Sequence, residues 1–240
     1  MIKNFFYIGT SGYFYKDWLK TIYKGEKDLL KVYEKYLNAL EINSTFYRLP
    51  SFSSIKNYQK YNLYYIFKLN RKVTHYKNFD KETLGFFVRI KEILKENYKG
   101  ILAQFSPYFS SKEKNKDFLL KLKDYFLKEN IYVFFELRHI SWENELNFFK
   151  ENKINVIKAY FPNYLKWSKA FNFEDNKTYF RVHGFRKLYF DDVKDKLEDI
   201  KNDILKLKKQ ENFIFFNNTL NGYAFYNALK LKEILDVVSK

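Results

Sequence analysis

Short apolar segments alternate with longer amphipathic segments along the whole chain, and this alternation predicts the fold. The short segments are rich in Ile, Leu, Val, Phe and Tyr, which is typical of strands. Between them apolar residues recur at intervals of three and four, as at Val193, Leu197, Ile200 and Ile204, which predicts helices. Strands are expected at residues 2–8, 39–43, 64–70, 100–106, 131–139, 154–160, 178–183 and 213–218.

The order of these elements favours one class of fold. Strands that alternate with helices through short connections are parallel, with right-handed crossovers. About eight such units in 240 residues fit a TIM-type (β/α)8 barrel, a single α/β domain over residues 1–240. A doubly wound open sheet is the alternative, and its strands would usually be apolar on both faces.

Polar side chains on one face of nearly every strand decide between these folds. In the seventh strand Tyr179, Arg181 and His183 share one face, and Phe180 and Val182 share the other. Polar residues stand within the other strands in the same way, at Glu41, Asn43, Lys68, Gln104, Glu136, Arg138, Lys158 and Asn217. In a barrel this face becomes the lumen, where an isolated charge is costly. The charged residues are therefore expected to pair there, near the carboxyl ends of the strands.

Motifs between the strands predict local features. Gly9-Thr-Ser-Gly12 is expected to end the first strand in a loop, either as a tight turn or as backbone that approaches a phosphate. Ser51 and Ser141 stand where an N-cap hydroxyl would begin a helix. Residues 71–75 and 161–176 are expected to be loops.

Composition restricts the class of protein further. The formal charge of +16 fits a polyanionic partner such as nucleic acid, and it equally fits a general enrichment in Lys. Only six of the 44 basic residues are Arg, the side chain that nucleic-acid interfaces favour. The absence of Cys excludes disulfides and thiolate metal sites and fits a reducing compartment. The apolar run 5–8 is too short for a signal peptide or a membrane span, so a soluble cytoplasmic protein is expected.

Apart from Arg89, which lies in a helical pattern, the scarce Arg and His residues gather where strands are expected to end. TIM-barrel enzymes use that face, so a cationic pocket with embedded carboxylates is expected there. Glu41, Glu136 and His183 are the candidate catalytic residues, with one of the two carboxylates as a general base. Arg and His suit phosphate or carboxylate recognition, and the candidate ligand-binding residues are Asn43, Arg48, Lys68, His75, Arg138, His139, Arg181, Asn217 and Asn218.

Other interpretations of the same residues stay open. The charged side chains could form only a buried ionic lattice, and Glu41 and Glu136 could be the carboxylate pair of a glycosidase. A metal site would need His75, His139 and His183 to converge with carboxylates; their spacing matches no metal motif, so no metal ligand is assigned and the cofactor is unknown. Aromatic residues in or beside loops are candidates for a pocket rim: Tyr13, Tyr15, Trp18, Tyr47, Trp142 and Trp167.

Several motifs occur in order over nearly the whole chain. They are Ile8-Gly-Thr-Ser-Gly-Tyr-Phe-Tyr-Lys-Asp-Trp18, Glu41-Ile-Asn-Ser-Thr-Phe-Tyr-Arg-Leu-Pro50, Lys68 with Thr74-His75, Phe135-Glu-Leu-Arg-His-Ile-Ser-Trp142, Arg181-Val-His-Gly184, and Phe216-Asn-Asn218 with Gly222, Ala224, Asn227 and Ala228. In this combination the chain resembles the YecE-like family, also called domain of unknown function 72.

The resemblance implies a TIM-type barrel and no particular activity. That barrel is held to be similar to those of metal-dependent apurinic endonucleases and sugar isomerases, a likeness of fold alone. Two aspartates that are frequent in the family are absent here. The chain reads Ala159-Tyr-Phe-Pro162 after the sixth strand, and Thr219 follows the Asn pair of the eighth.

Two functional hypotheses follow. The first is a TIM barrel that binds a phosphorylated or other anionic small molecule, with phosphodiester hydrolysis as a reaction. Replacing Arg138 or Arg181 by Ala should then weaken binding while the barrel still folds. The second is a non-catalytic protein that binds nucleic acid through its basic surface, with an affinity that falls steeply as salt rises. Oligomeric state is left open.

Overall fold

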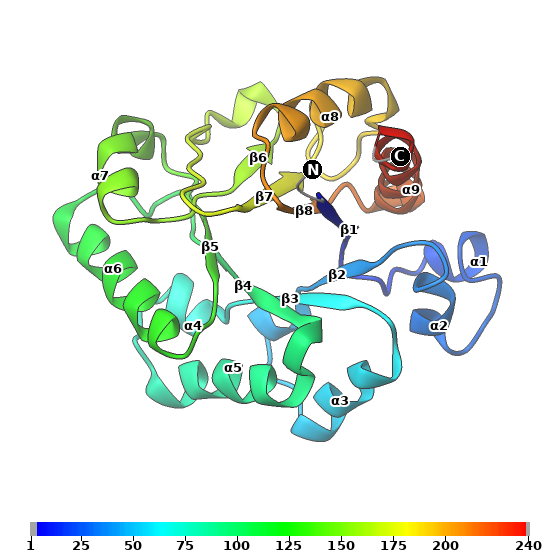
Figure 1. Ribbon diagram of the computed structural model, residues 1–240, viewed down its shortest axis with the longest axis horizontal. Coiled ribbons are helices and arrows are strands. Elements are labelled where there is room, and N and C mark those ends of the chain that lie inside the picture. The colour runs from blue at the N-terminus through cyan, green and yellow to red at the C-terminus, as the bar shows by residue number, and fades with distance from the viewer. Residues whose placement is uncertain (1–3, 239–240) are drawn as a thin grey trace.

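A computed structural model describes residues 4–238 and contains a ring of eight parallel strands with helices outside it (Figure 1). The strands are β1 (Phe5–Ser11), β2 (Ala39–Ile42), β3 (Tyr64–Lys68), β4 (Tyr98–Gln104), β5 (Val133–Glu136), β6 (Lys158–Tyr160), β7 (Lys177–Val182) and β8 (Glu211–Phe216). Their hydrogen-bonded order is β5-β4-β3-β2-β1-β8-β7-β6. Because β1 pairs with both β2 and β8, the chain closes on itself through its first and last strands.

The remaining gap, between β5 and β6, is bridged by backbone hydrogen bonds at Phe135. Its N–H donates to the carbonyl of Asn155, and its carbonyl accepts from the N–H of Ile157, both at 2.9 Å. Val156 therefore lies beside Phe135 in parallel orientation just before β6 begins. The predicted TIM-type barrel is confirmed, as a nearly closed ring of parallel strands.

Helices pack around the outside of the ring. They are α1 (Trp18–Thr21), α2 (Leu29–Tyr33), α3 (Phe52–Asn57), α4 (Arg71–Thr74), α5 (Lys81–Leu94), α6 (Glu113–Lys128), α7 (Leu146–Glu151), α8 (Leu197–Lys206) and α9 (Tyr223–Val238). Short 3-10 segments are η1 (Ser44–Phe46), η2 (Tyr58–Lys60), η3 (Lys95–Asn97), η4 (Ile140–Asn144), η5 (Asn163–Leu165), η6 (Lys194–Lys196) and η7 (Leu220–Gly222). Leu197, Ile200 and Ile204 form the buried face of α8, as their spacing predicted.

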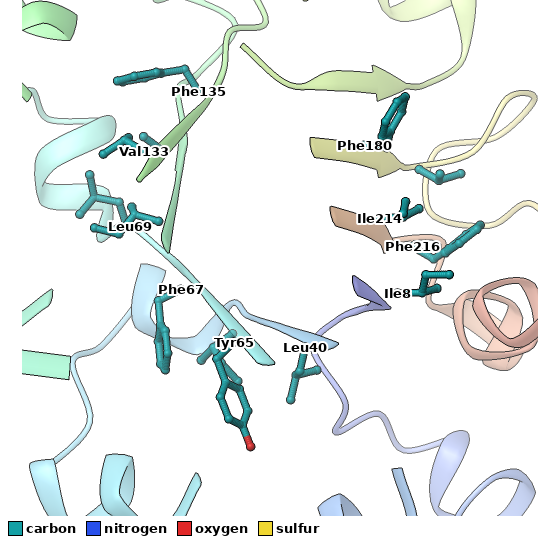
Figure 2. Close-up of a cluster of buried hydrophobic side chains, with 14 of the residues drawn as sticks. Ile8, Leu40, Tyr65, Phe67, Leu69, Val133, Phe135, Phe180, Ile214 and Phe216 are labelled. Atoms are coloured by element: carbon teal, nitrogen blue, oxygen red, sulfur yellow. The ribbon is translucent and has the colours of Figure 1, made fainter. Parts of the chain in front are cut away.

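Apolar side chains form two layers, one on each face of the barrel wall. The larger layer lies between strands and helices, and Figure 2 shows Phe67, Phe135 and Phe180 pointing away from the barrel centre. The smaller layer fills the lumen with Tyr7, Ala39, Ile66, Leu102, Phe134, Ile157, Tyr179, Phe213 and Phe215. Strand residues alternate between these layers because successive side chains point to opposite faces.

The lumen changes from apolar to polar along the strand direction. In several strands an apolar lumen residue is followed two positions later by a buried polar one, in the pairs Ala39 and Glu41, Ile66 and Lys68, Leu102 and Gln104, Phe134 and Glu136, and Tyr179 and Arg181. Residues two apart on a strand share a face, so each polar side chain lies one level nearer the carboxyl ends. The packed apolar level is thus the base on which the polar level rests.

Gly9 lies inside β1, so the expectation that residues 9–12 form a loop was wrong for residues 9–11. Residues 2 and 3 of the predicted first strand lie outside the described residues. A Cβ on Gly9 would lie 1.8 Å from the carbonyl oxygen of Ala39 on β2. The lack of a side chain at Gly9 therefore allows the close approach of β2, and not that of a phosphate.

We expect Gly9→Ala to lower the free energy of unfolding by at least about 1–3 kcal/mol, because β1 and β2 must separate to admit the methyl group. Gly85→Ala is the matched control: a Cβ there meets nothing within 4 Å in α5, and Ala should raise helix stability by about 0.5–1 kcal/mol. Urea unfolding of both variants measures the difference. Equal stability of Gly9→Ala and wild type would contradict this account of β1.

Three other local expectations were wrong. Residues 71–74 form α4, because the side chain of Asn70 caps it by accepting the N–H of Lys72 at 3.0 Å. Ser141 does not cap α7; it lies inside η4, which is capped by the His139 ring. Lys158 does not enter the lumen.

The side chain of Lys158 points outward because Ile157 occupies the lumen position of that strand. Its Nζ lies 2.8 Å from Oδ2 of Asp203 on α8. This pair joins the barrel wall to the helix layer and contributes nothing to the polar lumen.

Candidate functional site

Arg181 is the centre of the polar level of the lumen. Its side chain is 1% exposed and comes from β7, whose alternation turns Tyr179 and Arg181 inward. Its Nη2 donates to Oε1 of Glu41 at 2.8 Å and its Nε to Oε2 at 3.1 Å. Its Nη1 donates to Oε2 of Glu136 at 2.7 Å and to Oε1 of Gln104 at 2.8 Å. The predicted pairing of Glu41, Glu136 and Arg181 is confirmed, and four of the five guanidinium N–H groups are used.

Both carboxylates are held in their charged form. Burial would raise the pKa of Glu41, but Arg181 and the hydroxyl of Tyr179, which donates to Oε2, hold that pKa below its ordinary value. Burial would likewise raise the pKa of Glu136, but Arg138 and Arg181 hold it well below the usual range. Neither carboxylate can therefore supply a proton near neutral pH.

Arg138 closes this network on the side of β5. Its Nε donates to Oε1 of Glu136 at 2.6 Å, and its guanidinium lies 4.0 Å from the ring centroid of Trp167. Arg138 is buried, so it pairs with Glu136 away from bulk water. It does not line the main cavity described below.

His183 is neutral and lies between Glu136 and Asn217, the residue that follows β8. Burial lowers the pKa of His183 to about 4, against the opposing effect of Glu136. Asn217 places its Nδ2 3.0 Å from Nδ1 of His183, so Nδ1 accepts and the ring proton is on Nε2. That Nε2 lies 3.6 Å from Oε1 of Glu136.

A cavity of about 670 Å³ opens at the carboxyl ends of the strands, above Arg181. It is lined by Tyr15, Asp17, Asn43, Phe46, Tyr47, Lys68, His75, Gln104, Arg181, Tyr189, Phe190, Asn217, Thr219 and Leu220. Of the candidate site residues, the structure brings Asn43, Lys68, His75, Arg181 and Asn217 to this cavity. Glu41, Glu136 and His183 are buried and do not line it.

Lys68 lies at the end of β3 and differs from the other buried charges. It is 9% exposed, and its ammonium has no hydrogen-bond or ion-pair partner among residues 4–238. Its Nζ lies 4.2 Å from the ring centroid of Phe46. Burial, together with the positive charge of Arg181, lowers the pKa of Lys68 to about 7.

Two adjoining loops hold the groups above Lys68. The side chain of Asn70 donates to the carbonyl of Thr45 at 2.8 Å, and the Thr45 hydroxyl donates to the carbonyl of Lys68 at 2.7 Å. These bonds join the loop after β2 to the loop after β3. His75 follows α4 and packs edge-on against Phe46, with ring centroids 4.9 Å apart. Burial, and then the nearby charge of Lys68, lower the pKa of His75, so its ring is neutral at pH 7.

The loop after β7 forms another wall of the cavity, which sequence reasoning missed. The backbone N–H groups of Phe185 and Arg186 donate to the carboxylate of Asp191, and the side chain of Asn218 donates to the Asp191 carbonyl at 2.6 Å. This clamp presents Tyr189 and Phe190 to the cavity. Asn218 therefore orders a loop and does not line the site. The run of aromatic residues after Arg181-Val-His-Gly184 was the signal available in the sequence.

Several residues proposed for the pocket lie elsewhere. Trp18 and Trp142 are fully buried, and their Nε1 groups donate to the carbonyls of Thr219 and Phe109, so they are core residues and not rim residues. His139 accepts the N–H of Ser141 at 3.1 Å as the cap of η4.

Arg48 lines a separate groove of about 330 Å³ beside the main cavity. The described residues contain no group of three His, Cys, Asp or Glu side chains arranged to hold a metal ion. His139 and His183 do not converge with His75, since the first caps η4 and the second lies in the lumen.

A nearly closed ring of eight parallel strands, with a cavity over their carboxyl ends, defines a TIM-barrel protein. The sequence profile of the family described as "Protein of unknown function DUF72" matches residues 7–240. The chain belongs to the DUF72 family, the family that the sequence motifs indicated. Among residues 4–238, no helix combines the length and apolar character that a membrane span requires.

Solved structures agree with this assignment. A DUF72 family protein from Thermotoga maritima is 26% identical, with a TM-score of 0.80 over 97% of this chain and 100% of that chain. A DUF72 family protein from Enterococcus faecalis is 21% identical, with a TM-score of 0.78 over 97% and 96%. A xylose isomerase domain containing protein from Salmonella typhimurium shares the fold at 12% identity and a TM-score of 0.54, over 98% and 96%. A search among curated proteins found no match.

Proposed function

We propose that this protein binds a small anionic molecule, such as a phosphorylated one, in the cavity at the carboxyl ends of the strands. The observation that carries this proposal is the buried ammonium of Lys68, which has no ion-pair partner among residues 4–238. Glu41 and Glu136 face Arg138, Arg181 and Lys68, and the two guanidiniums already pair with the two carboxylates. The ammonium of Lys68 is left without an anion and borders a cavity of about 670 Å³. A bound anion would supply the partner that this ammonium lacks.

Other lining residues restrict the ligand further. Tyr15, Phe46, Tyr47 and Tyr189 give the cavity aromatic walls suited to a ring or another flat apolar part. Asp17 also lines the cavity, and its Oδ2 has no hydrogen-bond partner among the described residues. That oxygen is suited to accept a hydrogen bond from a ligand hydroxyl or amine. The proposed ligand therefore combines an anionic group, a flat part and a donor.

Sulfate affinity is expected to fall as pH rises above 7, because sulfate keeps its charge over this range while Lys68 loses its proton. A bound anion stabilises the ammonium, so the affinity should be constant below pH 7 and fall by up to about tenfold per pH unit above it. Calorimetric titration from pH 5.5 to 9 measures this. Lys68→Met should abolish binding, and Lys121→Met, at an exposed Lys whose Nζ also lies over a Phe ring, should leave it unchanged. Tight binding by Lys68→Met would contradict the proposal.

Hydrolysis of a phosphodiester in the same cavity has less support. Glu41, Glu136 and His183 would have to act as acid or base, and all three are buried and absent from the cavity lining. The role that the contacts of Glu41 and Glu136 support is to hold the guanidinium of Arg181 in place.

Nucleic-acid binding is the second candidate, favoured by one feature of the surface. The groove beside the cavity shares Tyr47 with it and is also lined by Arg48, Arg71, Lys72 and Tyr76. Two arginines and exposed tyrosines side by side suit the phosphates and bases of a single strand. An oligonucleotide that bound Lys68→Met as tightly as wild type, with a steep dependence on salt, would favour this candidate over the small anion.

A further inference from the structure

Lys68 has the position expected of a nucleophile. Its amine stands at the carboxyl end of β3, on the wall of the cavity, with no hydrogen-bond or ion-pair partner among residues 4–238 that would have to be broken before reaction. The aliphatic chain is buried, and the Nζ is held 4.2 Å from the centroid of the Phe46 ring. An amine that is desolvated in this way and kept next to other cations is the kind of lysine that reacts with carbonyl groups.

We infer that the Nζ of Lys68 attacks a carbonyl group of the bound anion and joins it as an imine, an inference that rests on the proposed function. The substrate class narrows to an aldehyde, ketone or 2-oxo acid that also carries a phosphate or carboxylate. The neutral amine adds to the carbonyl carbon and forms the C–N bond, and the carbonyl oxygen takes up a proton. The C–O bond then breaks as the oxygen takes up a second proton, the one that the Lys68 ammonium released before the attack, and the oxygen leaves as water. The step needs no oxidant or reductant.

The imine product carries the same charge as the Lys68 ammonium. A protonated imine keeps the positive charge that the ammonium carried, so the anionic group of the substrate stays compensated after the reaction. His75 lines the same cavity, packs against the same Phe46 ring and is neutral at pH 7. It is placed to carry the proton that leaves Nζ and returns to the departing oxygen.

The charged groups around Lys68, together with its burial, keep a large fraction of its amine neutral at pH 7. Arg181 on β7 and Arg138 beyond β5 oppose its protonation, Glu41 on β2 and Glu136 on β5 favour it, and His75 is uncharged. Burial and these charges together lower the pKa of Lys68 to about 7, so that roughly half of the amine is neutral at pH 7. An ordinary lysine is neutral to only about 0.1% at pH 7.4.

Pyridoxal 5′-phosphate is a suitable probe, because it combines an aldehyde, a phosphate and an aromatic ring. The full-length protein is mixed with a substoichiometric amount, reduced with borohydride and digested, and the adduct is located by peptide mass. We expect at least about tenfold more adduct on Lys68 than on Lys99. Lys99 is a matched control, half-buried with its Nζ 4.6 Å from the ring centroid of Tyr64, and it borders neither the cavity nor Arg181.

The pH profile separates reaction from simple proximity. The yield at Lys68 should reach its plateau just above pH 7, whereas labelling of exposed lysines should still increase toward pH 10. Lys68→Met should lose the labelling that reaches its plateau just above pH 7, and Lys99→Met should keep it. A Lys68 yield no higher than that of Lys99, or one that still increases beyond pH 9, would overturn the inference.

Pyridoxal without the phosphate distinguishes this inference from the proposed function. If it labels Lys68 as well as pyridoxal 5′-phosphate does, the imine chemistry stands and the anion-binding proposal fails. If sulfate binds as expected but neither aldehyde labels Lys68 above Lys99, the anion-binding proposal stands and the imine inference fails. Preferential labelling by the phosphorylated aldehyde supports both.

Discussion

Arg181→Met is expected to lower the free energy of unfolding by about 3–5 kcal/mol, because it leaves Glu41 buried without a cation and Glu136 with Arg138 alone. Arg181 is 1% exposed, and its guanidinium also satisfies Gln104. Glu41 and Glu136 are 0% and 3% exposed. Urea unfolding monitored by circular dichroism measures the loss. The sequence suggested that the barrel would fold normally without Arg181, and its burial between two carboxylates argues against that expectation.

Two further variants test the cause of this loss. The double change Arg181→Met and Glu41→Gln removes this pair of charges at similar volume and leaves Glu136 with Arg138, so it should recover much of the stability because no unpaired ion remains. Arg186→Met is the exposed control, since its side chain is 70% exposed and its ion pairs are 3.9 Å long; it should change stability by less than about 0.5 kcal/mol. If the double variant were less stable than Arg181→Met alone, unpaired charge would not be the cause.

Lys68→Met is expected to raise the free energy of unfolding by up to about 4 kcal/mol at pH 6, while sulfate binding is lost. The folded-state pKa of Lys68 lies below its unfolded value of about 10.4, so the folded protein pays for the charge wherever both states are protonated. That cost is full below pH 7, decreases as pH rises from 7 to about 10, and is absent above this range. Met keeps the apolar contacts and removes the ammonium.

Unfolding of Lys68→Met and wild type at pH 6, 8 and 10 measures this difference, which should shrink steadily toward pH 10. Lys121→Met is the control, because its Nζ lies 4.6 Å from the ring centroid of Phe79 but the side chain is exposed. Its effect should be small at all three pH values. A stability gain that stayed constant with pH would mean that packing, and not the proton, is responsible. A residue whose removal stabilises the fold is typical of a site kept for function.

The alternation of side chains along single strands was enough to predict the polar lumen. Tyr179 and Arg181 on one face, and Phe180 and Val182 on the other, predicted both the closed barrel and the pairing of Arg181 with carboxylates. The same reasoning failed for Lys158, because the alternation has the opposite phase there: Val156 belongs to the outer layer and Ile157 to the lumen, so Lys158 points outward. Where a strand begins decides which face each of its residues takes.

The separation between cavity and core could not be predicted in the same way. Trp18 and Trp142 stand in motifs beside the site, yet their indole N–H groups bond to carbonyls inside the core. Tyr189 and Phe190 reach the cavity only because Asp191 accepts backbone N–H groups and so folds the loop back. Such contacts depend on the conformation of loops, whose sequences lack the periodic pattern that predicts strands and helices.

The sequence by itself determined the class of fold and the chemistry of the lumen, since both follow from local alternation and from a regular order of strands and helices. The tertiary structure alone decided that Arg181 pairs with both carboxylates and that Lys68 has no ion-pair partner among residues 4–238. The physical reason is distance along the chain: Arg181 and Glu41 are separated by 140 positions, and only closure of the ring brings them to 2.8 Å. Which charges neutralise one another, and which one faces the cavity, is settled when the strands meet.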